Sequence, residues 1–537
     1  MRRNFDRNRG DGILARIALI VGLVSNSGCD SSASMGATPG GAQDEALATE
    51  KIDLGKVPRA EDITVEGKLA SHDLPLEGPA CTRPLCISSA YAVAPTLDTD
   101  KSAVFVQIGF SSGIDAATFH RAPLNLSVVV DRSGSMAGEK IAAVRTALSK
   151  LVQQLHEGDR LSIVLFDDRV DVLLPSTPVT DPIAIQALIS SISVRGATDM
   201  SAGLREGFSQ VSRYLGSPGV SNRVIVLTDA IANTGSTDTT SFISQAQAAA
   251  NNDIGLTVFG VGIDLNQQLV LAISKLRGGN YAYLADRDRI STIFDQDFDY
   301  LVTPLAYDMK FRLTPGSGFS VRSVYGFPSW TTASTTVEID VATVFLSRNR
   351  GAIVARLSPT GDVWPLGASP IANLSLSYEP VDEAGSLTDT YDAVYDGQDR
   401  LSDTSQVYSQ AGVRRTVAYV NSALGEKLAC SRYWSGDKTN AIATLDKTEA
   451  SLTLEAMAID DSELDVEAMQ VARLRNNMQS GYVDNSYRTG DETGDGWPTL
   501  GCSLARVPSA SSRSRATLLL ALMLGGWLAG RKRQAHD

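Results

Sequence analysis

Continuous apolar runs alternate with segments of helical periodicity between Pro123 and about Tyr300. The runs read LNLSVVV, LSIVLF, RVIVLT and IGLTVFGVG. Strands that are apolar on both faces occupy the centre of a mainly parallel sheet that is covered by helices. The clearest helix follows the first run, where apolar side chains recur every three or four residues at Ile141, Val144, Leu148, Leu151 and Leu155. Residues 123–302 are therefore predicted to form an α/β domain with a doubly wound, Rossmann-like sheet.

The pattern differs on both sides of this domain. Residues 86–122 and 303–400 contain short apolar stretches between turn residues, such as AVFVQIGF and TVEIDVATVFL, which predict β-strands. We expect these strands to form one β-sandwich-like region into which the α/β domain is inserted. Residues 401–480 are predicted to be helical, whereas residues 30–85 and 481–510 have the composition of a flexible tether and a linker.

The first 29 residues are typical of an export signal. Five arginines precede the apolar run IALIVGLV, and small residues lead up to Cys29. A cysteine in this position indicates lipid attachment, although Asn26 stands where the usual lipoprotein signal prefers Leu. Cleavage near Cys29 without lipidation is the alternative.

The C-terminal end, residues 511–537, has an apolar run from Ala516 to Gly530 followed by a basic tip. This run is shorter than the ~20 residues of a full membrane span. The order of Gly-Cys-Ser around Cys502, a spacer, the apolar run and the basic tip resembles the myxobacterial C-terminal sorting tail. That resemblance implies that Cys502 is the processing and anchoring point, and a plain C-terminal membrane anchor is the alternative. Either reading predicts an exported protein of the cell envelope or cell surface.

Net charge excludes one class of partner, and the positions of the cysteines indicate their chemistry. The formal net charge of -13 argues against nucleic acid as a partner, because phosphate binding requires a basic face. Cys81 and Cys86 are close enough to form a disulfide in an oxidising compartment. Cys430 is then left as a single, buried thiol. The sequence contains no CxxC pair, so a structural zinc site is not expected.

The candidate chemistry lies in VVVDRSGSMAG, which begins at Val128. Asp131 and Asp229 each end a predicted buried strand, and the carboxyl ends of parallel strands meet at one edge of a sheet. Ser133 and Ser135 alternate along a tight turn, and a third loop supplies Thr198. Two carboxylates and three hydroxyls form an all-oxygen set suited to a hard cation such as Mg²⁺. Neutral hydroxyl ligands quench little of the cation's charge, so it can still accept an external carboxylate.

This set resembles the metal-ion-dependent adhesion site of the von Willebrand factor A domain, in which DxSxS is followed by a loop Thr and a later Asp. The resemblance covers about Pro123 to Tyr300 and implies Mg²⁺, or Mn²⁺ or Ca²⁺ in its place. It also implies adhesion or protein binding, usually without catalysis. One departure is Ala230, where the family often has Gly, and it puts the local turn geometry in doubt.

Several other roles are compatible with parts of this motif. Ser135 could merely cap a helix. A hydrolase or phosphatase that uses Asp131 is disfavoured, because Ser133 stands where a phosphatase usually has a second Asp and no G-x-S-x-G elbow is present. Asp167 and Asp168 fit either the rim of a ligand site or a solvated turn, the latter more often. GDETGDG, which begins at Gly490, is better explained as linker than as a calcium loop.

Three functions follow from this reading, none of them enzymatic. The first is adhesion, in which the metal binds an acidic residue of a protein partner. The second is an envelope scaffold that organises neighbouring proteins. The third is a domain whose metal is purely structural. In each case the chain is expected to be held at a membrane by an N-terminal lipid, by the C-terminal anchor, or by both.

Overall fold

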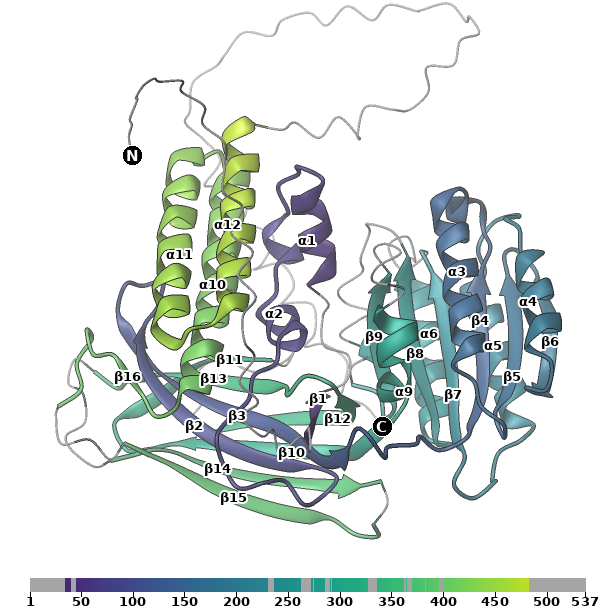
Figure 1. Cartoon of the computed structure of the whole chain (residues 1–537), viewed down its shortest axis with the longest axis horizontal. Helices are drawn as coiled ribbons and strands as arrows, with labels where there is room; N and C mark the ends of the chain where they lie inside the picture. Colours follow the sequence, from purple (N-terminus) through teal and green to yellow (C-terminus); the bar gives the residue numbers. More distant parts are fainter. Residues whose placement is uncertain are drawn as a thin grey trace, which may run out of the picture. The chain divides into compact units, whose positions relative to one another are not determined.

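The computed structural model describes the chain from the first strand to the last helix with several gaps (Figure 1). The described residues are 34–39, 45–229, 236–261, 272–273, 275–284, 290, 292–326, 336–361, 364, 369–381, 383–395, 397 and 400–481. The predicted export signal with Cys29, the linker beyond residue 481, and the C-terminal tail with Cys502 lie outside these residues. Ala230 lies outside them as well.

The central domain is a six-stranded sheet of order β6-β5-β4-β7-β8-β9. All neighbouring strands are parallel except β5 and β6, which pair in antiparallel orientation. The strands are β4 (Leu124–Asp131), β5 (Arg160–Phe166), β6 (Val170–Pro178), β7 (Ser221–Thr228), β8 (Ile254–Val261) and β9 (Gly279–Leu284). The mainly parallel α/β sheet is therefore confirmed, with the edge strands β6 and β9 as elements that the apolar runs did not predict.

Helices cover both faces of this sheet because its central strands are apolar on both sides. All eight residues of β4 are buried. Its alternate side chains enter different cores: Val128 and Val130 pack with α3, whereas Val129 packs with α5. The described helical elements of the domain are η2 (Gly134–Met136), α3 (Glu139–Gln153), α4 (Pro182–Ser190), α5 (Met200–Ser212), α6 (Ser236–Ala250), a π-helix (Thr292–Asp297) and α9 (Phe298–Leu301).

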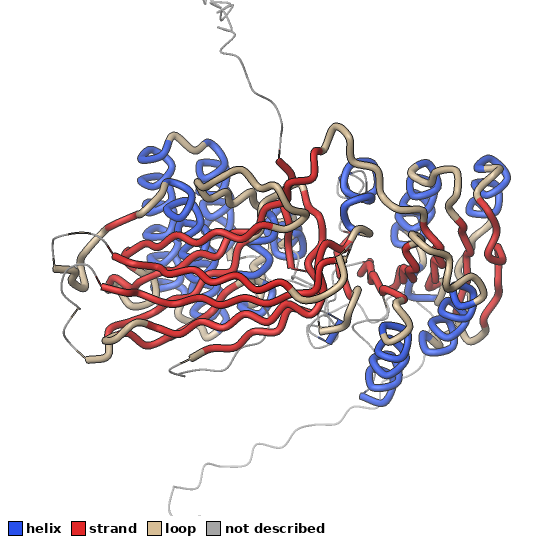
Figure 2. The backbone as a smooth tube through the Cα atoms, turned by 90° about the horizontal axis from the view of Figure 1, so that it is seen from below, coloured by secondary structure: helices blue, strands red, loops and turns tan. Residues whose placement is uncertain are grey.

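The flanking strands form a second, antiparallel sheet of ten strands among the described residues (Figure 2). Segments on both sides of the central domain contribute to it, as expected for an inserted domain. The strands are β1 (Ser34–Pro39), β2 (Cys86–Pro95), β3 (Ser102–Asp115), β10 (Pro304–Pro315), β11 (Phe319–Tyr325), β12 (Val337–Ser347), β13 (Ala352–Pro359), β14 (Ser369–Pro380), β15 (Leu387–Tyr395) and β16 (Val407–Tyr408).

This second region is one continuous hydrogen-bonded sheet rather than two separate sheets. The long strand β3 connects it, because β3 pairs with β2 along one edge and with β13 and then β1 along the other. Alternate residues of β3 enter different cores, with Val104 and Val106 on one face and Ala103 and Phe105 on the other. Both faces of β3 are therefore buried.

The C-terminal helices pack over one face of this sheet (Figure 1). They are α10 (Ala411–Trp434), α11 (Lys438–Ile459) and α12 (Ser462–Ser480). Asp437 and Asp461 cap the starts of α11 and α12: Asp437 accepts a hydrogen bond from the backbone N–H of Asn440, and Asp461 accepts hydrogen bonds from those of Glu463 and Leu464. Cys430 is fully buried in α10, as expected for an inert thiol.

The flexible tether predicted for residues 30–85 is wrong over most of its described length. This segment contains β1, α1 (Ala46–Asp53), η1 (Ala60–Asp62) and α2 (Val65–Ser71). The sequence did not indicate this ordered structure, because the segment is polar in composition. Several of its contacts are made to residues about 400 positions later in the chain, which a local pattern does not show. Lys68, for example, donates a hydrogen bond to Glu467.

Two further features concern the cysteines and the membrane. Cys81 and Cys86, the pair predicted from their spacing, form a disulfide with Cα atoms 5.7 Å apart. Within the described part of the chain, every helix is too short or too polar to span a bilayer.

Candidate functional site

The loop that follows β4 begins with a buried carboxylate that organises its own turn. Asp131 is fully buried, and its Oδ1 accepts a hydrogen bond from the backbone N–H of Ser133 at 2.8 Å. Its Oδ2 accepts a hydrogen bond from the Thr228 hydroxyl on β7 at 2.6 Å. Burial raises the pKa of Asp131 despite these hydrogen bonds, and the nearby charge of Asp229 adds to the rise. Asp131 is thus held between the two strand ends that the sequence predicted to be neighbours.

A row of oxygens runs from this loop to the end of β7. Ser133 Oγ lies 3.1 Å from Ser135 Oγ, and Ser135 Oγ donates to Asp229 Oδ1 at 2.9 Å. The other carboxylate oxygen of Asp229 accepts a hydrogen bond from Lys140 Nζ at 2.7 Å. Ser133 and Asp229 are buried, whereas Ser135 is exposed. Both ends of the row are therefore buried, and its middle member, Ser135, is open to solvent.

The loop that carries Thr198 is tied to the first loop through its backbone. The Arg195 N–H donates to the Arg132 carbonyl at 2.7 Å, and the Gly134 N–H donates to the Gly196 carbonyl at 3.1 Å. Thr198 itself is exposed, and among the described residues no hydrogen bond joins its side chain to the row of oxygens. The structure thus brings Asp131, Ser133, Ser135 and Asp229 into direct contact and places the loop of Thr198 beside them.

Asp167 connects the loop of Arg132 with the loop of Arg195. The sequence analysis did not predict this role. Its carboxylate is fully buried and pairs with Arg132 at 2.7 Å and with Arg195 at 2.8 Å. Burial alone would raise the pKa of Asp167, but hydrogen bonds, led by that from Arg195, lower it to about 2. Asp167 is therefore neither a ligand rim nor a solvated turn. The sequence signal was an Asp after a buried strand together with an Arg inside the DRSGSM motif.

The donor set fits a small divalent cation. Adjacent oxygens around an octahedral Mg²⁺ ion are about 2.9 Å apart, since metal–oxygen distances are about 2.0–2.1 Å. The separations of 3.1 Å and 2.9 Å along the row are close to this value. The charge of Asp229 raises the pKa of Asp131, and Lys140 pairs with Asp229 alone of these two carboxylates, so added positive charge would be stabilised. The residues present thus fit a divalent metal.

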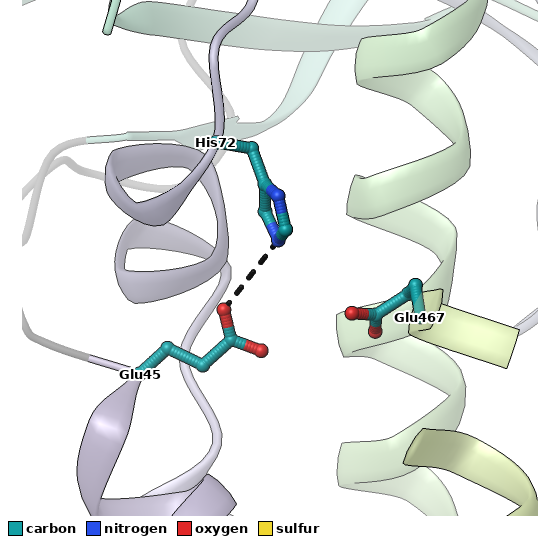
Figure 3. A group of neighbouring side chains, drawn as sticks. All are labelled: Glu45, His72 and Glu467. Atoms are coloured by element: carbon teal, nitrogen blue, oxygen red, sulfur yellow. Dashed lines mark ion pairs between the residues drawn. The ribbon is translucent and has the colours of Figure 1, made fainter. Parts of the chain in front are cut away.

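A second group of titratable side chains lies between α1, α2 and α12 (Figure 3). Ligand atoms of Glu45, His72 and Glu467 all lie within 4.8 Å of one another. However, the buried ammonium group of Lys68 contacts Glu45, lies 2.5 Å from Glu467 and lies 3.1 Å from Glu426. Lys68 therefore already provides the positive charge that a metal ion would bring. We interpret this group as a structural ion cluster.

The comparisons with known proteins concern mainly the central domain. Residues 125–296 match the family model of the von Willebrand factor type A domain. The uncharacterized protein YfbK of Escherichia coli strain K12 is 28% identical over 191 residues, which are 35% of this chain and 33% of that protein. Inter-alpha-trypsin inhibitor heavy chain H1 of Mesocricetus auratus is 29% identical over 206 residues, which are 37% of this chain and 22% of that protein. The chain thus covers a third or less of the length of each of these relatives.

Among solved structures, a von Willebrand factor type A protein from Catenulispora acidiphila aligns with 74% of this chain and 98% of its own. The sequence identity is 13% and the TM-score is 0.47. The family match coincides with the sheet and loops described above. Residues 125–296 of this chain therefore form a von Willebrand factor type A domain.

Proposed function

We propose that this chain binds a protein partner through a divalent cation held by Asp131, Ser133, Ser135, Thr198 and Asp229. The bound cation, Mg²⁺ or alternatively Mn²⁺ or Ca²⁺, would supply a charge and a coordination position for a carboxylate of the partner. The observation that carries the proposal is the row of oxygens from Ser133 Oγ through Ser135 Oγ to Asp229 Oδ1, with steps of 3.1 Å and 2.9 Å. The activity is binding rather than catalysis.

Each residue has a distinct part in this proposal. Ser133 and Ser135 present neutral oxygens, which leave most of the cation's charge available to the partner. Asp131 fixes the position of Ser133 by accepting a hydrogen bond from the Ser133 backbone N–H. Asp229 holds the Ser135 hydroxyl. Thr198 joins directly or through water, and its exposure, like that of Ser135, leaves a route for a partner from solvent.

We also propose that the protein is exported and held at the cell envelope. This proposal rests on the sequence signals at Cys29 and Cys502, each near an apolar segment. Mass spectrometry of the processed protein together with membrane fractionation of Cys29→Ser and Cys502→Ser variants tests it. Full-length protein that stays in the cytoplasm with neither cysteine modified would contradict it.

The metal site is tested by calorimetric titration of the chain with Mg²⁺. We expect Asp131→Ala to weaken Mg²⁺ binding by about 10–100-fold, as is typical when a group that orients metal ligands is removed. Asp340→Ala, which removes an exposed carboxylate on β12, is the matched control and should bind Mg²⁺ like the wild type. Equal Mg²⁺ affinity in Asp131→Ala and wild type would refute the proposed site.

The partner is tested by affinity capture from the envelope of the producing cell, in Mg²⁺ and then in EDTA. A specific partner should be retained by the wild type in Mg²⁺, released by EDTA, and absent with Asp131→Ala. Replacing the partner's acidic residues with their amides, one at a time, should identify one whose loss abolishes binding. A partner that binds the Asp131→Ala variant as well as the wild type would exclude the proposed mechanism.

A further inference from the structure

A buried arginine lies at the end of β7 opposite to the oxygen row. Arg223 lies six positions before Asp229, about 20 Å away along an extended strand. Its side chain is 1% exposed, which makes it one of the largest fully buried side chains described. Gly255 on β8 makes this possible, because a Cβ there would lie 2.9 Å from Arg223 Nη2.

Among the described residues, all hydrogen-bond partners of the Arg223 guanidinium group are neutral. Nη1 donates to Thr257 Oγ1 at 2.9 Å and to the Gly278 carbonyl at 3.1 Å. Nε is buried without a hydrogen-bond acceptor, and no described carboxylate pairs with the group. Burial lowers the pKa of Arg223 to about 10, so it remains charged at neutral pH. A buried charge without a counterion is unfavourable, which makes the site receptive to an anion.

Arg223 is one of the residues that line a cavity of about 790 Å³. Such a volume accommodates a small organic ligand. The lining is both polar and apolar, and Phe119, Val302 and Leu305 are among its apolar residues. A second lining arginine, Arg277, is already neutralised by Asp308 and by Glu379, the latter at 3.1 Å. Arg121, which also lines the cavity, is paired with Asp159 and Asp299, and the lining carboxylate of Asp253 lies 3.8 Å from Arg277 Nε. Arg223 is therefore the lining arginine that has no paired carboxylate among the described residues.

We propose that this cavity binds a small organic carboxylate, with the carboxylate on Arg223 and the apolar body along Phe119, Val302 and Leu305. The guanidinium fork matches the two oxygens of a carboxylate, and charge-assisted hydrogen bonds are among the strongest in proteins. The apolar residues of the lining favour a ligand with several carbons over a bare inorganic anion. The site is independent of the oxygen row at the other end of the sheet.

Calorimetric titration of the full chain with hexanoate, acetate, hexanol and inorganic phosphate tests the proposal. We expect hexanoate to bind more tightly than acetate, phosphate or hexanol, since it has both the charge and the apolar body. Addition of EDTA should leave hexanoate binding unchanged, which separates this site from the metal-dependent one. Absence of measurable hexanoate binding to the wild type would overturn the proposal, whereas tighter binding of phosphate would overturn the carboxylate assignment.

Substitution locates the site. Arg223→Met should weaken hexanoate binding at least about tenfold, because it removes the charged donor. Arg213→Met, which removes an exposed positive charge of the same domain, should leave it unchanged. Equal binding by Arg223→Met and wild type would overturn the assignment.

A second measurement does not depend on the folding of the Arg223→Met variant. An aliphatic carboxylate bearing a diazirine can be photolysed on the wild-type chain and the labelled peptides mapped by mass spectrometry. Labels within 219–223 or 302–307, competed by hexanoate, support the cavity. Competed labels confined to other segments would place the ligand elsewhere and overturn the proposal.

Discussion

Lys140 Nζ donates a hydrogen bond to Asp229 Oδ2 at 2.7 Å, so a lysine from the first turns of α3 neutralises one carboxylate of the candidate metal site. The Lys140 side chain is 37% exposed, and solvent therefore screens much of its charge. Its ammonium group opposes the approach of a second cation to the same carboxylate. The metal affinity of the site is thus expected to be set partly by this lysine.

Replacing Lys140 with Ala should strengthen Mg²⁺ binding. We expect an increase of about threefold at low salt, because partly exposed charge pairs contribute roughly 0.2–1 kcal/mol, and a smaller increase at high salt. Calorimetric titration with Mg²⁺ at two ionic strengths measures this. Lys150→Ala is the matched control, since Lys150 lies on the same helix but pairs with Asp295. Weaker Mg²⁺ binding by Lys140→Ala would contradict the prediction.

Lys68 should be essential for the stability of the helical region. Its buried ammonium group is the shared partner of Glu45, Glu426 and Glu467, which lie on three different parts of the chain. Lys68→Met leaves these carboxylates without their counterion, and breaking a buried ion pair typically costs about 3–5 kcal/mol. Denaturant unfolding followed by circular dichroism measures the loss.

The control for this variant is Lys101→Met. The Lys101 side chain is 72% exposed and lies 4.0 Å from Asp403. Its replacement should change the free energy of unfolding by less than about 0.5 kcal/mol. Similar losses for both variants would mean that the buried cluster has no special role.

Two members of the same cluster should act on stability with opposite dependence on pH. Burial lowers the pKa of His72 to about 4, so the unfolded chain binds more protons than the folded chain between about pH 4 and 6.5. His72 therefore makes stability rise with pH in this window. Burial raises the pKa of Glu426 to about 7, so the folded chain binds more protons above pH 4.5. Glu426 therefore makes stability fall as the pH rises from about 4.5 to 7.

Single substitutions separate these two effects. Between pH 4.5 and 6.5, Glu426→Gln should make the slope of unfolding free energy against pH more positive than in the wild type. His72→Gln should make that slope more negative. Each change is limited to about 1.4 kcal/mol per pH unit, the value for one proton. Urea unfolding at several pH values measures the slopes, and changes of the same sign in both variants would contradict the assignment.

Gly207 should be required for the close packing of α5 on the central sheet. A Cβ at this position would lie 2.4 Å from Val129 Cγ2. Overpacking of this kind costs about 1–3 kcal/mol, which exceeds or offsets the gain of up to about 1 kcal/mol from replacing Gly in a helix. We expect Gly207→Ala to be destabilised in thermal or denaturant unfolding.

A double variant provides the control for Gly207. Val129→Ala removes the methyl group that the new Cβ would meet. In the Val129→Ala background, Gly207→Ala should therefore be much less destabilising or even stabilising. If the substitution costs the same in both backgrounds, the contact with Val129 is not its cause.

Local pattern was sufficient to predict the central domain. The runs that became β4, β5, β7 and β8 are apolar on both faces, and a parallel central strand requires that pattern. The two edge strands were missed: β6 is partly exposed and lacks such a run, and β9 has the mixed sequence GNYAYL. The spacing of Asp131, Ser133 and Ser135 within one loop, and of Asp229 at a strand end, allowed their convergence to be predicted.

Other features depended on contacts between residues that are distant in the sequence. Three features arise from pairings across hundreds of residues. They are the ordered structure of residues 45–71, the ion cluster of Lys68 and the single continuous sheet built around β3. The burial of Asp167 and Arg223 is of the same kind, since each charge is enclosed by other segments. The sequence by itself determined the central strands of the α/β domain, its first helix and the oxygens that meet at one edge of the sheet, because those properties depend on local periodicity and spacing. The tertiary structure alone decided which charges are buried and with which partners, because desolvation depends on neighbours that local pattern does not specify.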